Sequence, residues 1–146
     1  MDVRLLGGLT CGFVGVLLAG CSGGTPLYPV SGKVTHKGSP LSGALVTFHP
    51  KDSNDPRAER PTGYTNEDGT FKLTTGQKEG APAGQYVVTV ICTRKVQQTE
   101  NKGKIFNTGG TDETVDILGG AYANPQASKI TVEVKPGPNE VPINLQ

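Results

Sequence analysis

Residues 84–93 read Gly-Gln-Tyr-Val-Val-Thr-Val-Ile-Cys-Thr and contain the strongest strand signal in the chain. Both sets of alternating side chains are rich in apolar and β-branched residues, which is typical of a strand at the centre of a sheet. The last apolar position of one set is Cys92. The alternation predicts that Cys92 is buried and structural, because a catalytic thiol needs a basic partner and the neighbouring sequence supplies none.

The same period of two continues on either side of this stretch, between clusters of turn residues. The 146 residues include 21 glycines and 11 prolines, a content of helix breakers that argues against an all-α protein. The predicted strands are Val30–His36, Ala44–His49, Thr62–Thr65, Thr70–Thr74, Tyr86–Thr93, 130–135 and 141–145. Burial of their apolar faces requires two packed sheets, so the predicted fold is all-β, a seven-stranded antiparallel β-sandwich. Pro142 should lie at an edge or at a position without a ladder hydrogen bond.

The first twenty residues differ in composition from the rest of the chain. Arg4 precedes a mostly apolar run of 14 residues, Leu5 to Leu18. A bilayer-spanning helix needs about 20 such residues, so the run suits the apolar region of a signal peptide better. It ends in Leu18-Ala19-Gly20-Cys21, and Ser22-Gly23-Gly24 follows.

This junction resembles the bacterial lipobox, in which a branched apolar residue and two small ones precede a cysteine that receives lipid. The resemblance implies a signal peptide at 1–20, lipid attachment at Cys21, a lipidated flexible tether at 21–27 and one domain at 28–146. Several acyl chains would hold the protein stably on a membrane. In bacteria with two membranes, Ser22 implies export to the outer membrane, facing the periplasm or the exterior. The alternative is an ordinary secretory signal with a chance cysteine.

Three further fragments, at 30–46, 65–71 and 82–88, combine short strands with glycine-containing turns in a particular order. Together they resemble the carboxypeptidase-regulatory-like domain, which is common in small bacterial lipoproteins. The resemblance covers 28–93 and continues through 129–145. It implies a transthyretin-like, Ig-like sandwich, and it brings no catalytic residues with it.

A search for catalytic or metal-binding patterns finds none. The two histidines, His36 and His49, stand near strand ends without metal-ligand spacing and are expected to be exposed edge residues. The segment Asn66-Glu67-Asp68-Gly69 offers too few oxygens for calcium and is better interpreted as a hairpin turn. The formal net charge of +1 gives no basic surface for nucleic acid. We therefore expect no enzyme, no cofactor and no nucleic-acid partner.

The segment 97–128 is the part that the strand pattern does not explain. About thirty residues without clear periodicity are unusual inside a small domain, so this long loop is either an insertion or the functional surface. It contains the aromatic residues Phe106 and Tyr122. Its acidic residues are Asp112, Glu113 and Asp116.

Three function classes follow from these observations. The preferred one is a membrane-anchored, non-enzymatic envelope lipoprotein whose sandwich binds an envelope protein or polymer, or acts as a spacer. The second is a small-ligand or glycan binder that uses the 97–128 loop. The third is an enzyme of unrecognised type.

The segment around Glu79 also resembles adhesin domains with an internal crosslink. Lys33 and Asn144 would be the partners in that crosslink, although the alternation places Lys33 toward solvent.

Overall fold

A computed structural model describes residues 24–53, 58–96 and 113–146, and these residues contain strands and turns but no helix. The larger sheet has six strands in the order β13-β10-β4-β5-β7-β8. Their bounds are β13 Thr131–Val134, β10 Gly84–Ile91, β4 Leu45–Pro50, β5 Thr62–Tyr64, β7 Thr74–Thr75 and β8 Lys78–Glu79. All five pairings in this sheet are antiparallel.

The second sheet is built around β2 (Val30–His36). The strand β14 (Asn139–Leu145) pairs along one side of β2, while β3 (Ser39–Pro40) and β6 (Thr70–Lys72) pair along the other. The β14–β2 pairing is parallel, with Val141 opposite Gly32 and Ile143 opposite Val34. The expectation of an antiparallel sandwich is therefore wrong for this pair.

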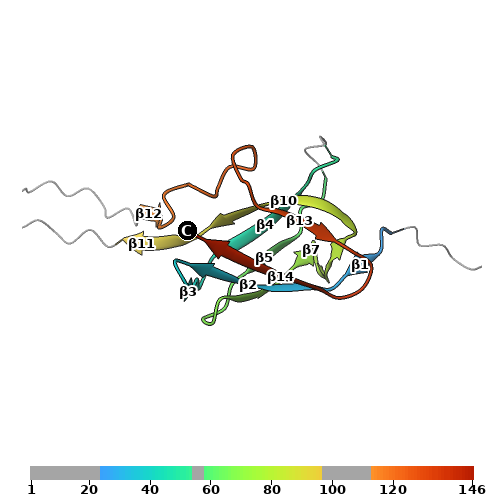
Figure 1. Ribbon diagram of the computed structural model, residues 1–146, viewed down its shortest axis with the longest axis horizontal. Helices are drawn as coiled ribbons and strands as arrows, with labels where there is room; N and C mark the ends of the chain where they lie inside the picture. Colours follow the sequence, from blue (N-terminus) through green and yellow to red (C-terminus); the bar gives the residue numbers. More distant parts are fainter. Residues whose placement is uncertain (1–23, 54–57, 97–112) are drawn as a thin grey trace, which may run out of the picture.

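Two short ribbons complete the described structure. At one end of the molecule β1 (Leu27–Tyr28) pairs with β9 (Ala81–Pro82), and at the opposite end β11 (Thr93–Val96) pairs with β12 (Glu113–Asp116) (Figure 1). The chain thus enters the sandwich at the β1 end, and the β11–β12 ribbon projects from the far end.

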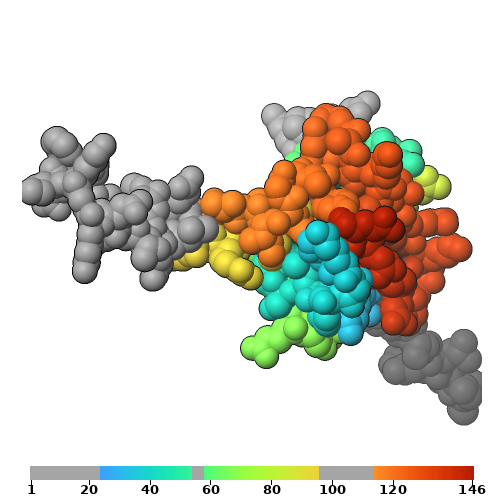
Figure 2. All heavy atoms as spheres, turned by 60° about the vertical axis from the view of Figure 1, so that its left-hand side comes forward, coloured from blue at the N-terminus to red at the C-terminus, as the bar shows by residue number. Residues whose placement is uncertain are grey.

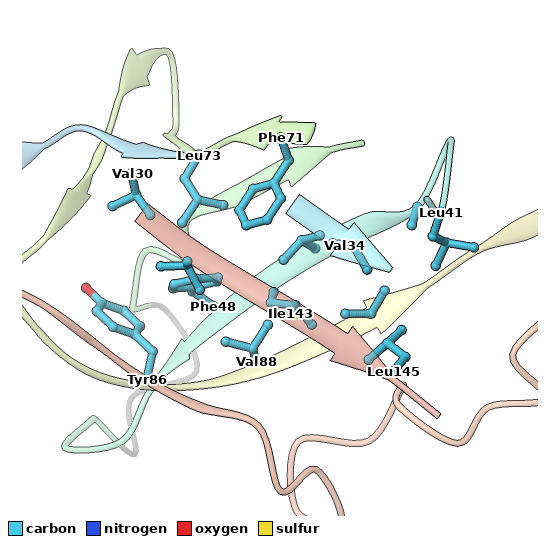
Figure 3. Close-up of a cluster of buried hydrophobic side chains, with 14 of the residues drawn as sticks. Val30, Val34, Leu41, Phe48, Phe71, Leu73, Tyr86, Val88, Ile143 and Leu145 are labelled. Carbon is cyan, nitrogen blue, oxygen red and sulfur yellow. The ribbon is translucent and has the colours of Figure 1, made fainter. Parts of the chain in front are cut away.

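The core lies between the two sheets, as predicted. Alternate residues of β10, namely Tyr86, Val88 and Val90, face it together with Phe48 of β4. The opposing sheet contributes side chains to the same cluster, which Figure 3 labels: Val30, Val34, Phe71, Ile143 and Leu145. The rings of Phe48 and Tyr86 lie 5.6 Å apart at 50°, a favourable tilted arrangement.

Gly32 has a packing role at the centre of β2. A Cβ atom there would meet the carbonyl oxygen of Val141 and would lie 2.7 Å from the Phe71 ring. The missing side chain therefore lets the phenyl ring lie directly over the β2 backbone.

The predicted hairpin of Thr62–Thr65 and Thr70–Thr74 forms at its turn and again at its far end, where Thr62 pairs antiparallel with Thr74. The N–H of Asn66 donates to the carbonyl of Thr70, and the N–H of Gly69 donates back to Asn66. Beyond the turn, β6 joins the β2 sheet while β7 joins the larger one. Leu73, fully buried between β6 and β7, donates its N–H to Val30. The hairpin pairing is therefore interrupted at β6, where the chain crosses to the other sheet, and it resumes at β7 after the buried Leu73.

Candidate functional site

The predicted lipid site lies outside the described residues. Cys21, Ser22 and the signal segment 1–20 precede Gly24, where the description begins. From there the chain reaches β1 within three residues, and Tyr28 already packs against the core. No helix among the described residues is long and apolar enough to cross a bilayer. The β1 end of the sandwich is therefore the end next to any attachment at Cys21.

At the far end, the β11–β12 ribbon corrects the expectation that 97–128 lacks regular structure. Arg94 pairs with Val115 and Lys95 with Thr114. The described part of the 97–128 segment therefore begins with a strand, β12. Two large apolar side chains are exposed here, Val115 on β12 at 43% and Ile117 directly after it at 41%.

Asp116 holds the ribbon to the sandwich. Its Oδ1 accepts hydrogen bonds from the N–H groups of Cys92 (3.2 Å) and Leu118 (3.1 Å), and its Oδ2 accepts one from Gly120 (2.9 Å). The N–H of Ile117 also donates to the carbonyl of Cys92. The Asp116 carboxylate thus acts as a cap for the turn that follows β12.

Tyr122 is likewise engaged within the fold. Its hydroxyl donates to the carbonyl of Gln146 (3.0 Å) and accepts from the N–H of the same residue (3.1 Å). Its own carbonyl accepts from the N–H of Val90. Figure 2 shows the segment after β12, in orange, lying against the red C-terminal strand. Phe106 and Asp112, the other proposed ligand-binding residues, lie outside the described part of the chain, as does the side chain of Glu113.

His49 is not an exposed edge residue. It lies on β4, which is flanked by β10 and β5, and its Nε2 is 2.9 Å from the Oγ1 of the buried Thr89. Burial lowers the pKa of His49, and the positive charge of Arg60 lowers it further. His36 is half-buried near the end of β2. The described residues contain no group of three or more possible metal ligands.

Cys92 is buried, as the alternation of its strand predicted. It is 4% exposed, and its Sγ lies 3.4 Å from the carbonyl oxygen of Ser42. Burial raises the pKa of the thiol, and the negative charge of Asp116 raises it further. The reactive thiolate is therefore disfavoured.

The internal crosslink finds no support in this geometry. Lys33 is exposed, as the alternation predicted. Asn144 accepts a hydrogen bond from Thr35, and Glu79 forms an exposed ion pair with Lys72 at 3.5 Å. The three groups are thus not gathered in one buried site.

A shallow cleft of about 500 Å³ lies at the β1 end and was not anticipated from the sequence. Its lining includes Thr25 before β1, Pro50 at the end of β4, and Tyr86 on β10. Asp52 and Glu59 give it two exposed carboxylates. The one feature of the sequence that points to this cleft is the charge- and proline-rich stretch at 50–61. Such a stretch is equally typical of a solvated loop.

No family model and no curated protein matches the chain. One similar solved structure is a DUF3823 family protein from Parabacteroides merdae, at 19% identity and a TM-score of 0.40, covering 84% of this chain and 47% of that one. Another is a 9R-lipoxygenase from Cyanothece, at 13% identity and a TM-score of 0.39, covering 82% of this chain and 16% of that one. The chain thus spans about half of the first structure and a small part of the second. Similarity at this level assigns no activity.

Proposed function

We propose that the protein is a membrane-anchored, non-enzymatic envelope lipoprotein whose sandwich serves as a binding or structural module. The observation that carries the proposal is the junction Leu18-Ala19-Gly20-Cys21, which resembles a lipobox and stands a few residues before β1. Since β1 is at one end of the sandwich, an anchor at Cys21 places the β11–β12 ribbon at the membrane-distal end (Figure 1).

The anchor is tested by metabolic labelling with a fatty acid and by detergent phase separation of the full chain expressed in a bacterium. Cys21→Ser should abolish the label and move the protein to the aqueous phase. Cys11→Ser is the matched control, because it removes a thiol from the same apolar segment and should change neither result. Equal labelling of the Cys21→Ser variant and the wild type would refute lipid attachment at this residue.

Sorting of the lipoprotein between the inner and outer membranes is tested with a second substitution. In a host with two membranes, the wild-type protein should fractionate with the outer membrane because Ser22 follows the lipidated cysteine. Ser22→Asp should shift it toward the inner membrane. An unchanged distribution would contradict this part of the proposal and leave the anchor itself standing.

The ribbon is the proposed contact surface for an envelope protein or glycan, because it projects from the distal end and carries the exposed Val115, with the exposed Ile117 directly after it. A photo-crosslinking amino acid at Val115 should capture an envelope component in intact cells. The same group at Lys78, exposed on the two-residue strand β8, is the control and should capture much less. Equal yields at the two positions would refute a specific role for the ribbon.

A further inference from the structure

The outer edge of β13 presents backbone hydrogen-bonding groups that the described fold does not use. The N–H of Val88 donates to Ile130, and Tyr86 lies opposite Val132 in the same register. In an antiparallel pair, hydrogen-bonded positions alternate with positions whose backbone groups point away. The N–H and C=O groups of Thr131 and Glu133 therefore point away from β10, toward the open edge.

The other long edge strand is protected. In the described structure β14 has β2 as its strand partner. Asn139 donates its N–H to Pro29 and Leu145 accepts from Lys37, so the odd-numbered residues of β14 bond to β2 and the backbone of Pro142 points to the open edge. Proline has no N–H, so the middle of the β14 edge cannot complete a ladder with another strand. The β8 edge has only two residues. Of the two edges of the six-stranded sheet, β13 is therefore the longer, with four residues and no proline.

The charges along β13 favour pairing with itself. We propose that two copies of the protein pair antiparallel through their β13 edges, with Thr131 opposite Thr131 of the second copy. In this register Lys129 of each copy faces Glu133 of the other, which forms two cross-strand pairs of opposite charge. The backbone groups agree as well, because Thr131 and Glu133 both point outward. Lys129 precedes the first residue of β13 by two positions, so its pairing with Glu133 would extend the strand at its N-terminal end.

The apolar face of the strand fits the same register. Ile130 and Val132 pack against the core but remain half-exposed. The pairing places Ile130 of one copy opposite Val132 of the other, on both sides of the two-fold axis. A second copy would thus cover the exposed parts of both side chains and join two six-stranded sheets into one.

Such an interface is small compared with the roughly 1,200–2,000 Å² of stable complexes. Weak, reversible association is therefore expected for dilute protein. Attachment to a membrane would raise the local concentration and strengthen the pairing, although the edge itself does not depend on the anchor.

Cysteine crosslinking of the full chain tests the register. Residues in a hydrogen-bonded antiparallel pair have Cα atoms about 5.5 Å apart, within disulfide range. Thr131→Cys should therefore give a disulfide-linked dimer under mild oxidation. Glu133→Cys is the matched control, because its two copies would be separated by roughly 14 Å along the strands. The Lys129→Cys/Glu133→Cys double variant should crosslink again, and the wild type sets the background from its own cysteines.

Exchange of the charges at positions 129 and 133 tests whether the pairing of the two β13 edges is specific. In the Thr131→Cys background, Lys129→Glu should reduce crosslinking several-fold because it sets carboxylates against each other, and the added Glu133→Lys should restore it. Thermal unfolding of each variant shows whether the monomer remains folded. The proposal is overturned if folded Thr131→Cys crosslinks no more than wild type, or no more than Glu133→Cys. If lipid labelling fails while crosslinking persists, the anchor is refuted and the β13 pairing stands.

Discussion

Phe48 at the centre of the sandwich has no exposed surface, whereas Val115 on the β11–β12 ribbon exposes 43% of its own. The two regions are stabilised by different interactions. Apolar side chains from both sheets enclose Phe48, while backbone pairing and the Asp116 carboxylate hold the ribbon. The difference indicates that the sandwich carries the stability and that the ribbon can change in sequence without loss of the fold.

Phe48→Ala against Val115→Ala is the most direct test of this difference. Loss of the buried ring should cost about 4 kcal/mol of unfolding free energy, because it removes buried apolar area and leaves a cavity. Val115→Ala should change it by less than about 0.5 kcal/mol. Denaturant unfolding measures both. Similar losses for the two variants would show that the ribbon is part of the stabilising core.

Gly32→Ala tests how tightly the core is packed. The added methyl group would meet the Val141 carbonyl and the Phe71 ring, so we expect a loss of about 3 kcal/mol. Gly24→Ala is the control, since a Cβ there has no atom within 4 Å. Thermal denaturation should show a large decrease in Tm for the first variant alone. A small effect at Gly32 would mean that β14 can move away from β2.

Asp116→Ala should weaken the attachment of the ribbon while leaving the core intact. It leaves three N–H groups without their acceptor, with an expected cost of about 1–3 kcal/mol that falls mainly on the ribbon and turn. Hydrogen exchange should accelerate at the amides of Cys92, Leu118 and Gly120. Amides of β2 serve as the internal reference. Uniform acceleration across the protein would contradict a local role.

The smallest expected effect is a pH dependence from His49 on the outer face of the larger sheet. Because burial and Arg60 lower its pKa in the folded state, the unfolded chain binds the proton more readily. Stability should therefore fall as the pH decreases through the ordinary value of 6.5 toward the lowered folded value, and then level off with respect to this group. His49→Asn should flatten this part of the unfolding profile. An unchanged slope would assign the pH dependence to another group.

Strand positions were largely predictable because half-buried strands have a period of two. The prediction for Val30–His36 matches β2, and every other predicted strand overlaps an observed one. The burial of Cys92 followed from the same alternation. The β11–β12 pairing was missed because each of its four-residue strands contains one apolar residue, which is too few to produce a periodic signal.

The candidate sites were less predictable. The role of Asp116 depends on the backbone of Cys92, which is 24 residues away in the chain. The half-buried position of His49 depends on Thr89 of β10, which is 40 residues away in the chain. Neither contact produces a local pattern, so sequence reasoning assigned Asp116 to an acidic cluster and His49 to an exposed edge.

Alternation and turn residues by themselves determined the all-β class and most inward-facing residues, because these depend on the local geometry of an extended chain. Tertiary structure alone decided the parallel β14–β2 pairing, the division of residues 70–75 between two sheets, and the open edge of β13. Strand neighbours and sheet edges are set by packing among distant segments, and the local periodicity is the same for each arrangement.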